Sequence, residues 1–170
     1  MFKYSFIVAA AVFFLSSCGQ KMKMVATEKN DSLAVDNVWK QYVGGVKARN
    51  PKLLKKLSLP QVYCQPCAIR IGGGDLVNAD VFVKDMLTNL PKTKLWEAVR
   101  TSRYLMVTER IKNYKPLNLD VKSEALDVYD VWYVTKVPTT MVKGYESQRY
   151  AFQFVKDKGQ YKLFGLTAVN

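Results

Sequence analysis

The spacing of apolar residues changes from a helical to a strand pattern near Pro91, and this change restricts the fold class. Before Pro91, apolar residues recur every three to four positions over residues 31–49 and 78–90, as one face of an amphipathic helix requires. Beyond it, dense aromatic and β-branched residues predict strands at residues 97–108, 119–137, 144–156 and 160–169. The sequence therefore predicts an α+β fold, in which N-terminal helices pack on a curved antiparallel β-sheet.

Prolines, asparagines and one glycine place the ends of these elements. Asn50-Pro51 ends the first helix and begins a short second helix over residues 51–57, because proline suits the first turn of a helix. Asn78 is a good cap for the third helix, which Pro91 ends. Gly159 tolerates a positive φ, so residues 157–159 are expected to form a tight turn between the last two strands.

The N-terminus carries a short apolar leader that ends at a cysteine. Lys3 precedes an apolar run over residues 6–15, and Ser16 and Ser17 then lead to Cys18. This pattern resembles the signal of bacterial lipoproteins. The resemblance implies that residues 1–17 are a signal peptide, that Cys18 is acylated, and that the protein is held in the cell envelope by lipid. A transmembrane helix is the alternative, but it needs about 20 apolar residues.

Residues 18–31 are polar and basic and show no helical or strand periodicity, so we expect a flexible tether between the lipid and a domain of residues 32–170. The residue after Cys18 is not acidic. This resembles lipoproteins sorted to the outer membrane, and the absence of an acidic run resembles those that face the periplasm.

The chain is strongly basic, with a formal net charge of +12. Part of this charge is concentrated in Lys47, Arg49, Lys52, Lys55 and Lys56. In a cytosolic chain such a cluster would suggest nucleic acid, but outside the cytoplasm anionic lipid, lipopolysaccharide or glycan is the expected class of partner. A solvated helix face that aids solubility is the alternative, and no nucleic-acid partner is expected.

Two stretches resemble a known superfamily. Residues 46–54 (VKARNPKLL) and 152–163 (FQFVKDKGQYKL) look like parts of the nuclear transport factor 2-like group, also called cystatin-like, which includes ketosteroid isomerase and the SnoaL-like proteins. The resemblance implies a cone-shaped sheet wrapped around the helices, a pocket at the open end of the cone, and dimers formed through the sheet. It implies a fold and not an activity, because this superfamily includes enzymes, binding modules and scaffolds.

The absence of histidine limits the chemistry of the chain. It excludes Ser-His-Asp and Cys-His nucleophilic systems and every metal site that uses histidine. It also departs from SnoaL-like relatives whose activity resembles a His-Asp pair. Any proton transfer would have to use Asp, Glu, Tyr or Lys, and no cofactor is expected.

Cys64 and Cys67 are the two cysteines that remain once Cys18 is acylated, and outside the cytoplasm they are expected to form a disulfide. Three roles stay open: a structural crosslink, thiol redox chemistry like that of a thioredoxin motif, or an intermolecular bond. Pro60, Pro66 and the glycines at 72–74 predict loops around the pair, whereas a thioredoxin motif lies between a buried strand and a long helix. Zinc would need two further ligands, so no metal site is expected.

One expected strand contains a carboxylate among apolar residues. One of its faces carries Leu126, Val128, Asp130, Trp132 and Val134, and the other carries Asp127, Tyr129, Val131, Tyr133 and Thr135. If the first face lines the cone, the pKa of Asp130 should rise, and Asp130 becomes a candidate general base or ligand anchor. The alternatives are an ion pair with Arg149 or Arg103, or a bulge that faces solvent.

Aromatic residues supply the candidate walls of a pocket, although core packing is the alternative at these spacings. With Trp132 and Asp130 of the strand above, the candidates are Trp39, Tyr42, Trp96, Tyr104, Phe152 and Phe154.

The expected function is binding without catalysis, either of an apolar or amphipathic small molecule or of a partner protein. The first alternative is an isomerase or hydrolyase of the ketosteroid isomerase type, which would use Asp130 with a tyrosine donor. The second is a dimeric scaffold. A closed and fully packed cone would favour scaffolding, whereas an open apolar pocket would favour ligand binding.

Overall fold

The computed structural model describes residues 15–101, 104–115, 126–135, 141, 143 and 149–169, with the side chains of the first helix described from Glu28 onward. In chain order the elements are α1 (Leu15–Lys47), α2 (Pro51–Lys56), β1 (Ser58–Cys64), α3 (Gln65–Ile71), β2 (Leu76–Asn78), α4 (Ala79–Thr88), η1 (Leu90–Lys92), α5 (Lys94–Thr101), β3 (Leu105–Tyr114), β4 (Leu126–Val134), β5 (Arg149–Asp157) and β6 (Gln160–Val169).

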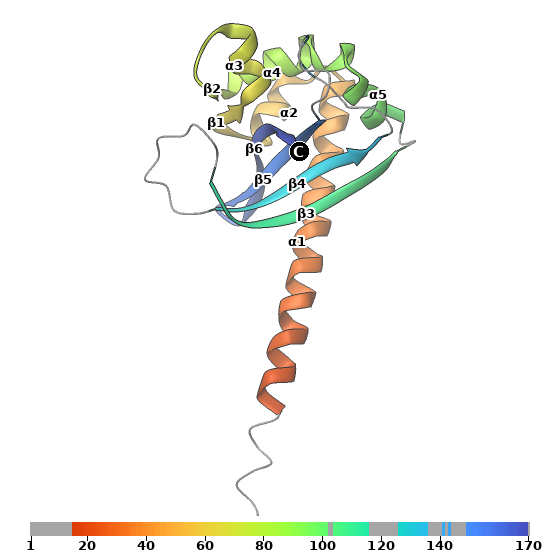
Figure 1. The fold of residues 1–170 in the computed structure, drawn as a ribbon, viewed down its shortest axis with the longest axis vertical. Helices are drawn as coiled ribbons and strands as arrows, with labels where there is room; N and C mark the ends of the chain where they lie inside the picture. Colours follow the sequence, from red (N-terminus) through yellow and green to blue (C-terminus); the bar gives the residue numbers. More distant parts are fainter. Residues whose placement is uncertain are drawn as a thin grey trace, which may run out of the picture.

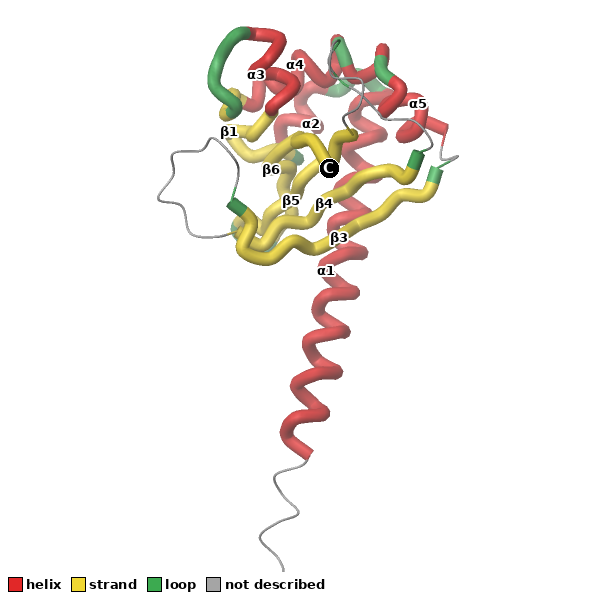
Figure 2. The backbone as a smooth tube through the Cα atoms, in the orientation of Figure 1, coloured by secondary structure: helices red, strands yellow, loops and turns green. Residues whose placement is uncertain are grey.

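The fold is α+β, with helices packed on a curved sheet of six strands in the order β2-β1-β6-β5-β4-β3. Strands β3 to β6 form the antiparallel meander that the sequence predicts, but β1 runs parallel to β6, so the sheet is mixed. Figure 1 shows α1 passing along one side of β3 and β4, and Figure 2 shows the same strands as one curved layer. The main core lies between α1 and this layer.

The structure confirms several element boundaries. Helix α2 begins at Pro51 after the Asn50 cap, whose side chain accepts a hydrogen bond from the Leu53 N–H at 3.0 Å. Asn78 caps α4 by accepting from the Asp80 N–H at 2.8 Å. In the turn between β5 and β6, Lys158 has a φ of 46° and Gly159 a φ of 80°. Two successive positive φ values match the turn that twists in the same sense as a hairpin.

Helix α1 is longer than expected and begins at Leu15, so residues 18–31 are helical instead of forming an irregular tether. This segment has no amphipathic face, which suggested an irregular structure. It is nevertheless rich in Gln, Lys, Met, Ala and Glu, and these residues have high intrinsic helix propensity. In Figure 1 the N-terminal part of α1 projects from the body of the domain. Among the described residues, no helix is both long and apolar enough to cross a membrane.

The strand expected at residues 97–108 is wrong in its first half. Lys94–Thr101 forms α5, and β3 begins only at Leu105. The helix buries one face through Leu95, Trp96, Ala98 and Val99, and the Thr93 hydroxyl accepts a hydrogen bond from the Trp96 N–H at 3.1 Å. The apolar residues of this segment are spaced in a way that fits either a helix or a strand, and in the structure they form one face of a helix. The parts of the other expected strands at 119–125, 136–137 and 144–148 lie outside the described residues.

The segment between α2 and α4 is more ordered than the loop that its prolines and glycines predict. It contains β1, α3 and β2. Pro60 is compatible with β1 because the register of β1 against β6 shifts between Ser58 and Tyr63, and proline is tolerated where a ladder bond is missing. Pro66 lies in the first turn of α3, where a backbone N–H would have no hydrogen-bond acceptor within the helix, so its absence costs nothing.

Candidate functional site

The space between α1 and the sheet is filled by aromatic side chains. The ring centroid of Trp39 lies 4.4 Å from that of Phe152, 5.9 Å from that of Tyr42 and 6.3 Å from that of Phe154. The Trp39 indole N–H donates a hydrogen bond to the Tyr133 hydroxyl at 2.9 Å. Trp39 is 1% exposed, and Tyr42 and Phe152 are not exposed at all. The structure therefore places these three pocket candidates, with Phe154, in a packed core.

The remaining aromatic candidates do not join this cluster of rings around Trp39. Trp96 is buried in α5, at the edge of the same core. Tyr104 is exposed just before β3, and Trp132 is half-buried on β4. The seven aromatic residues proposed to line one pocket are thus spread over the interior, the surface and the far side of the sheet.

The two faces of β4 are exchanged relative to the expectation. Tyr129, Val131 and Tyr133 belong to the main core that faces α1, so Asp130 and Trp132 point to the opposite side of the sheet. Alternation could not decide between the faces, because both carry apolar residues. The tyrosines can face inward because α1 supplies partners for their hydroxyls: Trp39 for Tyr133, and Asp31 for Tyr129 at 3.4 Å.

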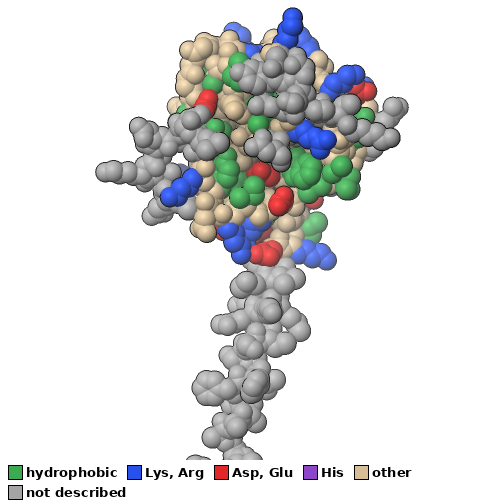
Figure 3. All heavy atoms as spheres, viewed as in Figure 1, with side chains coloured by type: hydrophobic (Ala, Val, Ile, Leu, Met, Phe, Trp, Pro, Cys, Tyr) green, Lys and Arg blue, Asp and Glu red, His purple; other side chains and the backbone are tan. Residues whose placement is uncertain are grey.

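We call the side of the sheet that points away from α1 the outer face. Strand register assigns to it Leu105, Val107, Glu109 and Ile111 of β3, Val128, Asp130, Trp132 and Val134 of β4, and Ala151, Gln153 and Val155 of β5. Leu105 is 69% exposed and Val134 is 42% exposed. In Figure 3 acidic side chains near the middle of the molecule lie between hydrophobic patches. The outer face is thus apolar with a polar centre.

Asp130 lies at this centre and is only 6% exposed. Burial raises its pKa to about 6, the hydrogen bond from Gln153 opposes the rise, and the charge of Glu109 adds to it. The bond joins Gln153 Nε2 to Asp130 Oδ1 at 3.0 Å. Arg149, one of the expected ion-pair partners, instead donates to the Thr135 carbonyl at 3.0 Å, and Arg103 lies outside the described residues.

Glycine at position 165 makes room for Gln153. A Cβ on Gly165 would stand 2.9 Å from Gln153 Oε1 and 3.1 Å from the Tyr63 carbonyl oxygen. Gln153 and Gly165 are paired across β5 and β6. The residue that supports Asp130 is therefore a glutamine in an apolar strand, which sequence reasoning did not single out.

Asp130→Asn should stabilise the protein near neutral pH. Because the folded-state pKa of Asp130 is raised from 3.8 to about 6, the ionised carboxylate disfavours folding above that range. The substitution should therefore add about 2 kcal/mol to the free energy of unfolding near pH 7.5, and this gain should vanish as the pH falls through about 6 to about 4. Urea unfolding at both pH values measures it.

Asp127→Asn is the matched control, since a hydrogen bond from Arg110 lowers the pKa of Asp127 and its ionised form is favoured. It should not stabilise the protein at either pH. If Asp130→Asn changed the free energy of unfolding equally at both pH values, the raised pKa of Asp130 could not be the cause of the change.

The structure joins Cys64 and Cys67 by a disulfide, with their Cα atoms 5.2 Å apart. Cys64 ends β1, and its sulfur accepts a hydrogen bond from the Cys67 N–H at 3.2 Å at the start of α3. The pair thus lies between a strand and a short helix, and the expectation of loops on both sides was wrong. Neither cysteine is exposed. Thiol exchange requires an accessible sulfur, so this geometry favours a structural crosslink.

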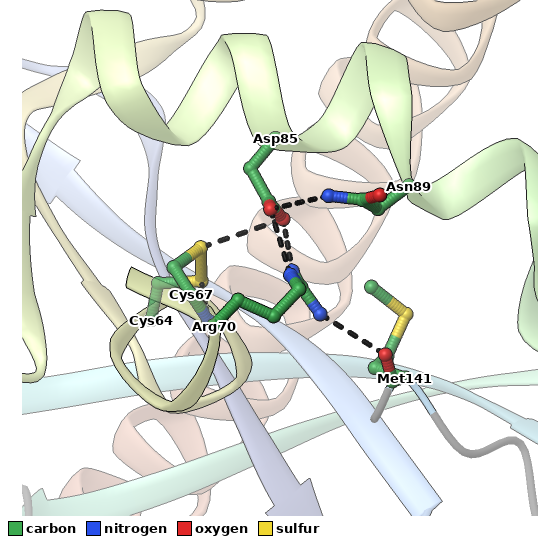
Figure 4. Close-up of a disulfide and its surroundings, with 6 residues drawn as sticks. All are labelled: Cys64, Cys67, Arg70, Asp85, Asn89 and Met141. Carbon is green, nitrogen blue, oxygen red and sulfur yellow. Dashed lines mark hydrogen bonds and ion pairs between the residues drawn. A yellow bond between two sulfur atoms is a disulfide. The ribbon is translucent and has the colours of Figure 1, made fainter. Parts of the chain in front are cut away.

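Asp85 links the disulfide to neighbouring elements (Figure 4). Its carboxylate lies 3.7 Å from Cys67 Sγ and accepts hydrogen bonds from Arg70 Nε at 2.8 Å and Asn89 Nδ2 at 2.7 Å. Arg70 also donates to the Met141 carbonyl at 3.0 Å. The carboxylate is buried, and the Arg70 side chain is 21% exposed. This network ties α3 to α4 and to residue 141.

The surface of the described part of the chain has hollows, and two of them bear on the candidate residues. The first, of about 250 Å³, is lined by Pro91, Lys92, Thr93, Lys94, Trp96, Glu97 and Arg100. The second, of about 700 Å³, is lined by Glu28, Lys29, Ser32, Val107, Thr108, Glu109, Arg110, Lys112 and Tyr129. Trp96 is the only pocket candidate that borders either of them. Neither is the aromatic-walled pocket inside the cone that the resemblance implies.

The basic cluster around α2 is exposed, and one member, Lys55, forms an ion pair with Asp80 at 2.6 Å. Within the described ranges, no three His, Cys, Asp or Glu residues come close enough to hold a metal ion.

No protein-family model matches the chain, and no curated protein matches it significantly in sequence. Its function is therefore inferred from the geometry of the domain.

Proposed function

We propose that this protein is a lipid-anchored component of the bacterial cell envelope whose domain binds a partner protein, without catalysis, through the outer face of its sheet. One observation carries the proposal. Aromatic side chains fill the interior around Trp39, whereas the outer face leaves Leu105 and Val134 exposed beside a polar centre. A packed interior favours docking at the surface over enclosure of a small molecule.

The proposed family is the nuclear transport factor 2-like superfamily. Helices followed by a curved sheet, with a long final hairpin of β5 and β6, support this assignment. The proposed location is the outer membrane, on the side that faces the periplasm, with Cys18 as the acylated residue. The leader over residues 1–17 supports the lipid anchor.

Isomerase or hydrolyase chemistry has less support. Asp130 would be its base, but Asp130 points away from the interior, and neither of the two hollows is lined by it. A base needs a substrate held against it in a site that excludes water. Neither described hollow holds a substrate against Asp130, which is itself almost completely buried.

A two-fold dimer through the outer face also has less support than a different partner. In such a dimer the same patch faces itself. Asp130 and Glu109, at the centre of the patch, would then approach the same two carboxylates of the second copy. Like charges brought together in an interface cost several kcal/mol. A partner with a complementary surface avoids this repulsion.

The test is photo-crosslinking in the bacterium that makes the protein. A photoreactive phenylalanine analogue at Leu105, on the outer face, should give one discrete adduct with another protein. The control is Leu33 on α1, which is 53% exposed on the opposite side of the sheet and should give no such adduct. Cys18→Ser cannot be acylated, so it should lose incorporated palmitate together with the adduct.

Two outcomes would count against the proposal. The first is the absence of an adduct at Leu105, or equal adducts at Leu105 and Leu33. The second is an adduct of twice the mass of the chain, which would assign the outer face to a homodimer. Persistence of the leader on mature protein would overturn the lipid anchor.

A further inference from the structure

Strand β3 lies at one edge of the sheet and is the longer of the two edge strands. It has 10 residues and pairs with β4 on one side, whereas β2 at the opposite edge has 3 residues. Figure 2 shows β3 as the outermost strand of the curved layer. Every second residue of an edge strand points its backbone N–H and C=O groups away from the sheet. Within the described ranges, no strand pairs with these groups of β3.

Only the second half of this edge is protected against further pairing. Natural edge strands avoid added strands through charged side chains, proline, bulges or short length. In β3 the charges begin at Glu109, and the register against β4 shifts between Ile111 and Tyr114. Residues 105–108 (LMVT) carry no charge, no proline and no shift in register, and Leu105 is 69% exposed. The first half of the edge is therefore open to an added strand.

A hollow of about 700 Å³ lies beside the same edge, in the corner between β3 and α1. Its lining includes the four consecutive β3 residues 107–110, and Glu28, Lys29 and Ser32 of α1. Consecutive residues of a strand point to opposite faces of the sheet, so a hollow that borders all four runs along the edge of the strand. This corner has room for another extended backbone next to β3.

We infer that β3 receives an extended segment of the docking protein as a seventh strand, paired along residues 105–110. The inference rests on the docking proposed above and names its mode, in which backbone hydrogen bonds give affinity and alternate side chains give specificity. Leu105 and Val107 belong to the outer face, so the segment has apolar residues on that side. Thr108 and Arg110 bond to carboxylates of α1, so its residues on that side are polar. The segment thus alternates between apolar and polar residues and contains no proline.

A second copy of the chain fits this edge less well. In a two-fold antiparallel pair of β3 strands, residues of the outer face lie opposite each other. A pair centred at Val107 sets Leu105 opposite Glu109, and a pair centred at Thr108 sets Val107 opposite Glu109. A pair centred at Glu109 brings the two Glu109 carboxylates together, and like charges directly opposite are destabilising. A different protein with the alternating segment avoids all three arrangements.

The test is amide hydrogen exchange, followed by nuclear magnetic resonance, of the full, nitrogen-labelled protein in detergent micelles. The probe is the peptide acetyl-Lys-Val-Thr-Val-Thr-Val-Glu-amide, which alternates as required. In the free protein, alternate amides of residues 105–110 bond to β4 and exchange slowly, and the amides between them exchange fast. The peptide should slow these fast amides saturably, by at least about tenfold. Amides of Leu76–Asn78 in β2, at the other edge, should not change.

Two changes separate backbone pairing from contact by side chains alone. The first is the same peptide with N-methyl groups on two consecutive central residues, which removes one donor from each edge and should weaken binding by at least about tenfold. The second is Val107→Pro or Thr108→Pro, at whichever position the fast amide shows the N–H to point outward. Proline there keeps the ladder to β4 and should weaken binding of the unmodified peptide by about tenfold.

Three results would overturn the inference: no saturable slowing of the fast β3 amides, equal binding of the two peptides, or equal slowing in β2 and β3. The comparison of the peptides decides even if the proline variant does not fold. If the inference fails while the Leu105 crosslink persists, docking on the outer face stands without an added strand. If the crosslink is absent too, the proposed function fails.

Discussion

Replacing Trp39 with alanine is expected to lower the free energy of unfolding by about 3–5 kcal/mol, the range for deleting a large buried aromatic side chain. Trp39 contacts Tyr42, Tyr133, Phe152 and Phe154, and only 1% of it is exposed. Its removal leaves a cavity between α1 and the sheet and takes a hydrogen-bond donor away from the Tyr133 hydroxyl. Urea unfolding followed by circular dichroism measures the loss.

Trp132→Ala is the control for this prediction. Trp132 is half-buried on the outer face, so the same change there should destabilise the protein by about 1 kcal/mol or less. Comparable losses at both positions would mean that the interior around Trp39 is not the main source of stability. A loss confined to Trp39 would instead agree with a packed interior that has no room for a ligand.

Asp85→Ala is expected to cost about 3 kcal/mol of stability, because it leaves the Arg70 guanidinium partly buried without its anion. It also removes the acceptor of the Asn89 amide. The partial exposure of Arg70 lets water solvate the freed charge, so the loss should stay near the lower end of the range for a broken buried ion pair. Chemical denaturation under oxidising conditions, with the disulfide intact, measures it.

Asp80→Ala is the matched control on the same helix. Asp80 pairs with Lys55, but the side chains are 69% and 47% exposed, so the loss should be at most about 1 kcal/mol. The double variant Arg70→Ala, Asp85→Ala should recover part of the loss, because no unpaired charge is then left behind. Equal losses for Asp80→Ala and Asp85→Ala would refute a special role for the buried pair.

Local chemistry made some elements predictable from the sequence. Asn50 and Asn78 begin helices because their side chains accept N–H groups of the first turn, Pro51 suits the first helical position, and Gly159 permits the last hairpin. Residues 97–101 were assigned to a strand because the apolar residues of this stretch fit either period, and the cap by the Thr93 hydroxyl favours the helix Lys94–Thr101. The parallel pairing of β1 with β6 joins distant segments, which no local pattern encodes.

The candidate site could be predicted only in part. Alternation placed Asp130 and Trp132 on one face of a strand, but the choice of the face toward α1 depends on partners such as Trp39, far away in the sequence. Gln153 was missed, although a glutamine in an otherwise apolar strand, with a glycine in the next strand, was a usable signal. The partnership of Arg70 and Asp85 depends on how α3 and α4 meet and leaves no trace in spacing.

The unbroken course of α1 couples the proposed anchor mechanically to the core. From Cys18 to Glu28 the helix extends about 15 Å at its rise of about 1.5 Å per residue. Glu28 then joins Arg110 of β3 through an ion pair at 2.8 Å, and the same helix carries Trp39 into the interior. If Cys18 carries the proposed lipid, the continuous helix leaves no flexible segment between lipid and sheet, and α1 would act as a lever. Tension on the acyl chains would reach the aromatic interior directly, and the bilayer would set the direction in which the outer face points.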